Sequence, residues 1–249
     1  MCDEDVARVE VMLPFAAVVN TVPVLFWLVG FCFSRRELVG RLREEVEREL
    51  LVGREKEGVV RVKAVRGVVE GRCPLLMACY RETLRLTVHQ VSTRTVVKDT
   101  VVSGVAGREY LLKEGAVVQL AAGVGHGMEN YWGEDVGEFR PDRFLAGEEE
   151  GGEGPGSAKA VRAAFQPFGG GMHLCPGRYF AFSELVAVMA TLLLGFEVEP
   201  LEGAEWKLPA FATRSVIDAV AKPARHGEGF GMKVKARPGW EGVQWEYES

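Results

Sequence analysis

A glycine-rich segment around one cysteine, Phe168 to Ala181, constrains the fold of this chain more than any other stretch. Three consecutive glycines precede Cys175, and an apolar run follows it to about Leu194. We expect a loop that becomes a helix at Cys175, with Pro176 in the first helical turn. The unpaired N–H groups and the positive end of the dipole at a helix start stabilise a thiolate. Glycine lets the backbone pass close to a flat or bulky group, so the segment is suited to present a thiolate to a haem iron.

Composition and charge narrow the class of protein. The chain has 249 residues, 47% hydrophobic content and a net charge of −5, which allows one sizeable core and does not suggest a nucleic-acid partner. An odd number of irregularly spaced cysteines argues against a disulfide framework and favours a reducing compartment. They are Cys2, Cys32, Cys73, Cys79 and Cys175. The acidic first ten residues are unlike a signal peptide.

The stretch from Val11 to Phe33 is almost wholly apolar and contains Pro14 and Pro23. Its length is sufficient for a membrane span. It is equally typical of a helix that is hydrophobic on all sides and buried at the centre of a protein. Both interpretations fit these residues alone, and the motifs described next favour the buried helix.

The cysteine segment resembles the haem-binding signature of the cytochromes P450. Every fixed position of that signature is filled here, by Phe168, Gly171, Cys175, Gly177, Arg178 and Ala181. The resemblance implies that Cys175 is the axial iron ligand and that Phe168, Gly171 and Gly177 shape the cofactor site. It also implies that His173 contacts a haem propionate.

The Asn20-Thr21 pair, with Pro23 after it, is similar to the long oxygen-binding helix of the family. The similarity is closest to the branch containing cholesterol 7α-hydroxylase and prostacyclin synthase. It implies that Thr21 helps to deliver protons to bound dioxygen, with Asn20 in the place of the usual acid. A competing possibility is that the Thr21 hydroxyl bonds to a preceding carbonyl of its own helix. Val18 departs from the family, which often has glycine there.

Charged residues farther along match a structural ion-pair network of the family. Glu82 and Arg85 are three residues apart on a predicted helix from Pro74 to Leu86, so they share a face. Apolar neighbours favour burial of this pair over an exposed pair of little energetic value. The resemblance supplies Arg143 as the third member and Arg94 as a further propionate ligand; an exposed strand arginine is the alternative for Arg94.

Local patterns predict the remaining elements. A helix is expected from Ser34 to about Leu51, with Ser34 and Glu37 forming a capping box. Residues 109–112 and 116–120 are expected to form a hairpin with glycine in its turn. We expect His126 to be structural, residues 146–157 to form a mobile surface loop, and strands at 195–198 and 231–238.

Taken together, the resemblance implies a mainly α fold with small β-sheets. Residues 1–249 would form a partial domain, the C-terminal half from the oxygen-binding helix onward, without the N-terminal half or the membrane anchor. The implied activity is heme-thiolate monooxygenation of a lipophilic, sterol-like small molecule. The implied cofactor is haem b, and the implied partners are O2 and an NADPH-dependent reductase at the cytoplasmic face of the endoplasmic reticulum membrane.

Two other functions remain open from sequence. One is isomerisation of a peroxide without a reductase, and the other is an inactive membrane-associated remnant in which residues 11–33 span the bilayer. A zinc site is disfavoured, because His173 and Cys175 supply two ligands where structural zinc takes four.

Overall fold

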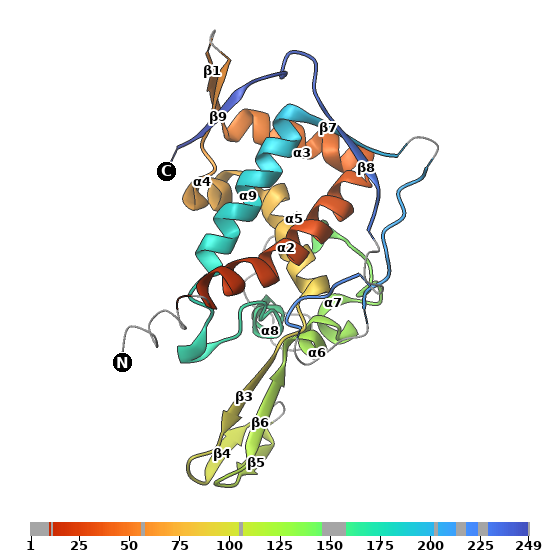
Figure 1. Cartoon of the computed structure of the whole chain (residues 1–249). Helices are drawn as coiled ribbons and strands as arrows, with labels where there is room; N and C mark the ends of the chain where they lie inside the picture. Colours follow the sequence, from red (N-terminus) through yellow and green to blue (C-terminus); the bar gives the residue numbers. More distant parts are fainter. Residues whose placement is uncertain are drawn as a thin grey trace.

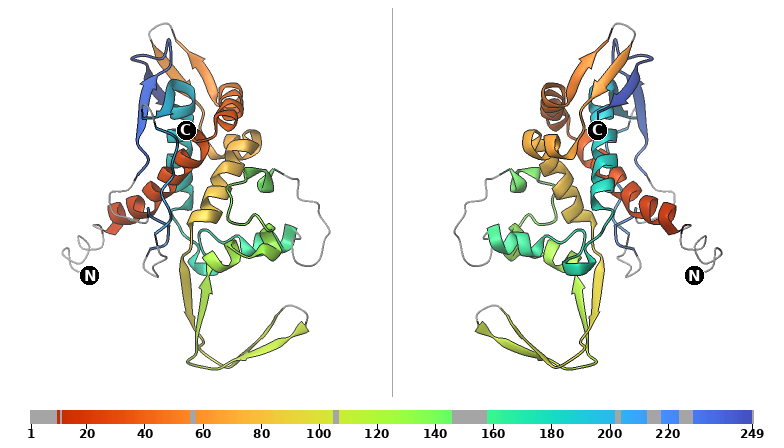
Figure 2. Two further views of the ribbon diagram at one scale, coloured as in Figure 1. Left: turned by 90° about the vertical axis from the view of Figure 1, so that its right-hand side faces the viewer. Right: turned by 90° about the vertical axis from the view of Figure 1, so that its left-hand side faces the viewer.

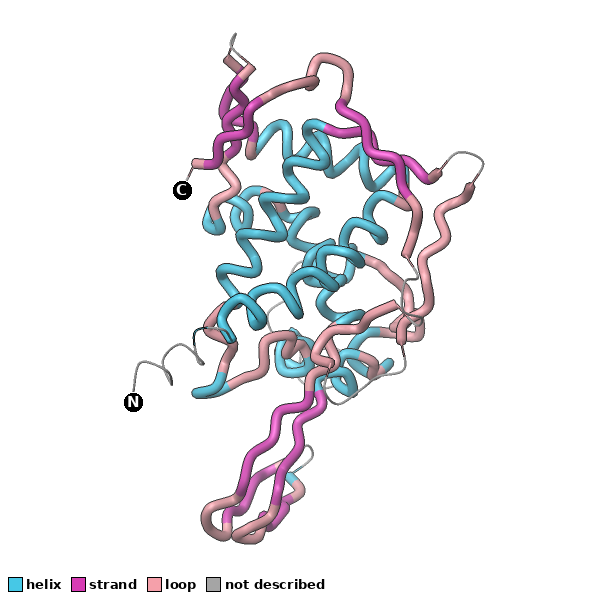
Figure 3. Tube along the Cα trace, in the orientation of Figure 1, coloured by secondary structure: helices cyan, strands magenta, loops and turns pink. Residues whose placement is uncertain are grey.

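The computed structural model describes residues 10, 12–55, 58–104, 107–145, 158–201, 204–212, 218–223 and 229–248. Helices gather at the centre and short strands lie at the periphery (Figure 3). The central helices are α2 (Met12–Phe33), α3 (Arg36–Glu49), α5 (Pro74–Thr87) and α9 (Arg178–Gly195). The predicted mainly α fold with small sheets is confirmed.

Helix α2 is buried over its second half only. From Val24 to Phe33 most side chains lie in the core, and the indole of Trp27 donates to Ala221 O at 2.8 Å. The first half leaves Phe15 and Val22 more than half exposed. Among the described residues, two helical segments have the length and hydropathy of a membrane span, Pro14–Phe33 and Arg178–Gly195. The expectation of a helix buried on all sides therefore holds only from Val24 onward.

Helix α3 begins at Arg36, and the predicted capping box is wrong. The Ser34 hydroxyl donates to Phe31 O instead of capping the helix, because the chain leaves α2 in a tight turn at this point. Further along α3, the buried carboxylate of Glu45 accepts the N–H groups of Leu75 and Leu76 at 2.9 and 2.8 Å. These are orphan donors of the first turn of α5, so Glu45 caps that helix from a neighbouring one.

Two small sheets lie at the edges of the helical core. In the first, β2 (Val59–Val62) pairs antiparallel with β1 (Leu51–Arg54) and parallel with β9 (Gln244–Tyr247). In the second, β7 (Phe196–Pro200) pairs antiparallel with β8 (Met232–Ala236), which confirms the strands predicted near residues 195–198 and 231–238. Helix α4 (Arg66–Arg72) connects the first sheet to α5.

A long β arm extends from the helical body (Figures 1 and 2). Strand β3 (Val91–Thr95) pairs with β6 (Val117–Ala121), and β4 (Thr100–Ser103) pairs with β5 (Glu109–Leu112). The predicted pairing of residues 109–112 with 116–120 is therefore wrong. Asp99 fixes the observed arrangement, because its carboxylate accepts from Lys113 Nζ and Glu114 N, both at 2.9 Å.

Short helical turns connect the arm to the cysteine segment. They are α6 (Ala122–His126), α7 (Glu129–Trp132), η2 (Pro141–Phe144), α8 (Ala158–Ala164) and η3 (Gly171–His173). His126 is structural, as expected: it is buried, its Nδ1 lies 2.9 Å from Val88 O, and its Nε2 accepts from Gln166 N at 3.1 Å. The loop predicted at 146–157 lies outside the described residues.

Candidate functional site

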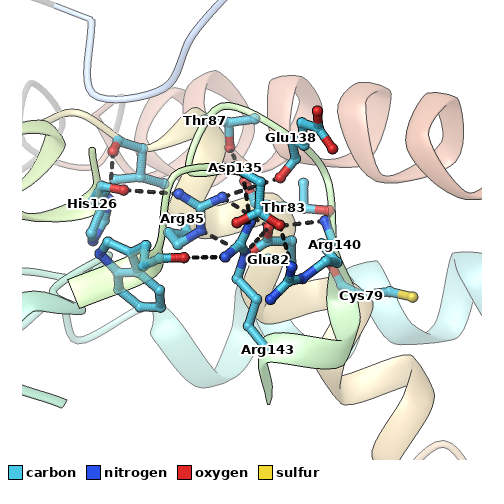
Figure 4. Close-up of polar contacts among 12 residues, drawn as sticks. Cys79, Glu82, Thr83, Arg85, Thr87, His126, Asp135, Glu138, Arg140 and Arg143 are labelled. Carbon is cyan, nitrogen blue, oxygen red and sulfur yellow. Dashed lines mark hydrogen bonds and ion pairs between the residues drawn. The ribbon is translucent and has the colours of Figure 1, made fainter. Parts of the chain in front are cut away.

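A buried carboxylate, that of Glu82, lies at the centre of a polar network in the C-terminal half of α5 (Figure 4). Glu82 accepts from Arg85 Nε at 2.7 Å and from Arg85 Nη2 at 2.8 Å. Arg143 Nε and the backbone N–H of Arg140 both reach the same carboxylate at 3.0 Å. The side chain of Glu82 is fully buried, and those of Arg85 and Arg143 are 1% and 5% exposed. The structure thus brings the three residues of the expected network into direct contact.

The two arginines extend the network to segments far apart in sequence. Arg85 donates to His126 O at 2.9 Å, and Arg143 donates to Asp135 O at 2.7 Å and to its carboxylate at 2.9 Å. The hydrogen bond from Arg143 holds the pKa of Asp135 below its usual range. Asp135 is a member that the sequence patterns did not predict, because its contact depends on the long-range folding of residues 129–143. The network fastens this irregular segment to α5.

A cavity of about 430 Å³ lies between α2 and the cysteine segment. Asn20 and Thr21 line it from α2, and Phe168, Cys175 and Gly177 line it from the cysteine segment. Much of the remaining wall is apolar, with contributions from Ala17, Val24, Phe180, Leu185 and Val220. Residues 154 positions apart in sequence (175 minus 21) therefore share one apolar cavity.

Thr21 differs from the other threonines on long helices. The hydroxyls of Thr83, Thr87 and Thr191 each donate to the carbonyl four residues earlier, at 2.7–2.8 Å. In the part of the chain that the structure describes, the Thr21 hydroxyl has no such bond. The competing possibility raised by the sequence is thus not the observed one, and the hydroxyl is free to bind a group in the cavity.

Cys175 precedes its helix by a turn, which corrects the predicted boundary. Helix α9 begins at Arg178 with Gly177 as its N-cap, so Pro176 is not in the first helical turn. Cys175 N donates to Phe168 O at 3.0 Å, and Arg178 Nη1 donates to Cys175 O at 2.9 Å. These bonds, together with positive φ angles at Gly169 and Gly171, fold the loop around the cysteine.

Cys175 is also the one described cysteine that is not buried in the core. Cys32, Cys73 and Cys79 are fully buried. Burial raises the pKa of the Cys73 thiol to about 12, which keeps it protonated at neutral pH. Thiolate chemistry in the described chain therefore belongs to Cys175.

Comparison with known proteins gives the family of the chain. The family model for cytochrome P450 matches residues 1–219. The chain belongs to the cytochrome P450 family.

Curated relatives show how much of a P450 the chain represents. A cytochrome P450 monooxygenase of Gibberella zeae is 41% identical over 97% of this chain and 45% of its own length. Cytochrome P450 monooxygenase nodJ of Hypoxylon pulicicidum is 30% identical over 98% of this chain and 46% of its own length. The 5-beta-cholestane-3-alpha,7-alpha-diol 12-alpha-hydroxylase of Sus scrofa is 29% identical over 76% of this chain and 37% of its own length. The chain thus spans less than half the length of these relatives.

The P450 family implies a haem, and the cavity residues fit that group. A thiol that is accessible, beside an otherwise apolar wall, is the donor set for a thiolate-ligated haem. A Cβ added to Gly177 would lie 3.9 Å from Cys175 Sγ, so glycine leaves room beside the sulfur. Phe168 and Phe180 supply aromatic surface in the same cavity.

Three residues of the predicted P450 cofactor site do not line this cavity. His173 is exposed on η3 and does not line the cavity. Arg94 lies on β3, where its guanidinium donates to Thr93 O at 2.7 Å. Gly171 shapes the loop without lining the cavity. The propionate roles expected for His173 and Arg94 therefore remain predictions.

Proposed function

We propose that this chain forms the cysteine-ligated haem site of a P450 monooxygenase that inserts one oxygen atom of O2 into a lipophilic small molecule. The observation that carries the proposal is the shared cavity of Cys175, Asn20 and Thr21. A cysteine sulfur and an uncommitted hydroxyl line the same largely apolar cavity from different elements. This is the arrangement that oxygen chemistry at a bound cofactor needs.

Each residue has a distinct task in this proposal. Cys175, held through its backbone by Phe168 and Arg178, would bind the haem iron as a thiolate. The haem, which we propose to be haem b, supplies dioxygen activation promoted by electron donation from the thiolate. The Thr21 hydroxyl would bind water or oxygen and pass protons into the cavity, and the Asn20 amide would orient it. The apolar walls would exclude bulk water.

The cavity walls and the relatives both support the proposed substrate class. An apolar cavity favours a lipophilic molecule. A sterol-like substrate is supported by the Sus scrofa relative, whose name says that it hydroxylates a cholestane diol. The proposed electron source is an NADPH-dependent reductase, and the proposed location is the cytoplasmic face of the endoplasmic reticulum membrane. Residues 1–249 are proposed to be one partial P450 domain, supported by the family match over residues 1–219.

Turnover under ¹⁸O2 tests the activity. Haem-loaded protein is supplied with NADPH, a P450 reductase and a sterol mixture, and products are analysed by mass spectrometry. We expect a product that carries one ¹⁸O atom and forms only when both NADPH and reductase are present. Conversion of a lipid peroxide without reductant, with no ¹⁸O incorporated, would instead establish the isomerase.

A further inference from the structure

A second cavity of about 290 Å³ lies next to the candidate haem cavity. Leu84, Pro167 and Phe168 line both cavities, so the two cavities share a wall. The second cavity is bounded by α4, α5 and the start of α9, and α4 packs against both of the other helices. Its buried lining residues include Met77, Leu84 and Phe182. The interior is therefore apolar.

Guanidinium groups surround the more exposed part of this second cavity. Arg66, Arg81 and Arg178 line it, whereas Glu70 is the one carboxylate among its described lining residues. Glu70 lies 3.7 Å from Arg66, and both side chains are 44% exposed. Three cations facing one anion leave the cavity with excess positive charge, which favours an anionic ligand.

Two of these cations converge on one phenol. The guanidinium carbons of Arg66 and Arg178 lie 4.1 and 4.0 Å from the ring centroid of Tyr179, and Arg178 Nη2 donates to its hydroxyl at 2.7 Å. Hydrogen bonds from Arg178 and then Arg66 lower the pKa of Tyr179. Glu70 pairs with Arg66, whereas Arg178 has no carboxylate partner among the residues that the structure describes. Tyr179 is about half exposed, and an anion held between these two guanidinium groups would lie beside its ring.

Tyr80 adds a hydroxyl donor to the lining of the same cavity. Tyr80 lines it and is only 5% exposed, yet its hydroxyl has no hydrogen bond to any residue that the structure describes. Burial is the main cause that raises the pKa of Tyr80, so the hydroxyl stays protonated and remains a donor. An oxygen-rich ligand in the cavity would accept a hydrogen bond from this hydroxyl.

We propose that this second cavity binds an amphiphilic anion, whose carboxylate or phosphate lies among Arg66, Arg81 and Arg178 and whose apolar part packs against Met77 and Phe182. Carboxylates and phosphates are the anions that guanidinium groups bind best, through paired charge-assisted hydrogen bonds. The site is separate from the haem cavity and does not require a haem. It is connected to the cysteine loop, because Arg178 also donates to Cys175 O at 2.9 Å.

Calorimetric titration tests the site with four probes below their micelle concentrations. Decanoate and decyl phosphate carry both the charge and the apolar chain, decanol lacks the charge, and inorganic phosphate lacks the chain. We expect the two anionic amphiphiles to bind at least about tenfold more tightly than either of the others. If both anions bind and decanol binds at least about tenfold more weakly than each of them, the charge is essential. A tighter binding of decanoate would indicate a fatty-acid ligand, and a tighter binding of decyl phosphate would indicate a phosphate ester.

Substitution of exposed arginines tests where the anion binds, with little expected effect on the stability of the fold. Arg66→Gln and Arg81→Gln should each weaken decanoate binding about tenfold or more, the loss expected for one charge-assisted hydrogen bond. Arg61→Gln, on β2 and outside the cavity, is the matched control and should bind like the parent. Equal affinity of all three variants, or decanol binding as tightly as decanoate, would overturn the proposal. Circular dichroism of each variant checks that the fold is retained.

Discussion

Substitution of Glu82 by glutamine tests how the irregular segment before the cysteine is held. The carboxylate accepts four hydrogen bonds between 2.7 and 3.0 Å, three of them from guanidinium groups, with no side-chain exposure. Glu82→Gln keeps the size but removes the charge, so that Arg85 loses its carboxylate partner and Arg143 keeps only Asp135. Breaking a buried pair in this way costs about 3–5 kcal/mol. The free energy of unfolding of a typical domain is roughly 5–15 kcal/mol, so this loss of stability is large enough to measure by urea unfolding.

The matched control is Glu55→Gln, which removes a carboxylate from an exposed pair with Arg61. Such a pair contributes at most about 1 kcal/mol, so this variant should unfold close to the parent. A variant with methionine at positions 82, 85 and 143 together should regain much of the loss, since it removes the uncompensated charges as well. Equal urea midpoints for Glu82→Gln and Glu55→Gln would refute this reasoning. If Glu82→Gln does not fold, the triple methionine variant provides the test. A folded triple variant supports the explanation by uncompensated charge, and an unfolded one contradicts it.

Three further predictions concern the cavity, the acid response and the packing. Thr21→Ala should leave the haem spectrum unchanged while lowering the amount of product formed per NADPH consumed. Thr21→Ser should restore that amount of product. An equal product yield from the parent and both variants would exclude a role for the hydroxyl. Because Arg143 lowers the pKa of Asp135, that carboxylate stabilises the fold above the unfolded pKa of about 4, and the contribution is lost as pH falls through the lower folded value. Asp135→Asn should therefore have a lower free energy of unfolding than the parent at pH 6, and the difference between the two proteins should shrink as urea unfolding is repeated toward pH 3. A difference that does not change with pH would contradict this assignment. Gly195→Ala should destabilise the fold by about 1–3 kcal/mol, because its Cβ would lie 2.5 Å from an indole carbon of Trp245. Gly40→Ala, at an exposed position of α3, should stabilise the fold by roughly 0.5–1 kcal/mol. Thermal melts that show the same sign for both variants would contradict the packing described for Gly195.

Elements with strong local signals could be predicted from sequence. Pro74 marks the start of α5 and stands at its N-terminus, where a missing N–H costs nothing. Glu82 and Arg85 lie on one face of that helix, and the apolar residues around them predicted burial. The order of motifs along the chain also placed Thr21 and Cys175 in one site, because each is fixed by a short and specific pattern.

The wrong sequence predictions concern strand pairing and a helix start, where the local sequence fits more than one structure. Residues 109–112 can pair with either neighbouring strand, and the decision rests on Asp99, whose carboxylate holds Lys113 and Glu114 across the arm. Pro176 suggested an earlier start for α9, but Gly177 is the N-cap. The second cavity had no signal in sequence at all, because Arg66, Arg81 and Arg178 come from three separate segments that only the fold brings together.

Cys175 is proposed to ligate a haem in the cavity that it shares with Thr21. A carbon monoxide difference spectrum of the reduced, haem-loaded protein tests it most directly, because a thiolate ligand shifts the Soret band to the red. We predict the shift for the parent and for Cys2→Ala, a second cysteine remote in sequence, and its loss in Cys175→Ala. A red-shifted band that persists in Cys175→Ala, or its absence from the haem-loaded parent, would contradict the assignment.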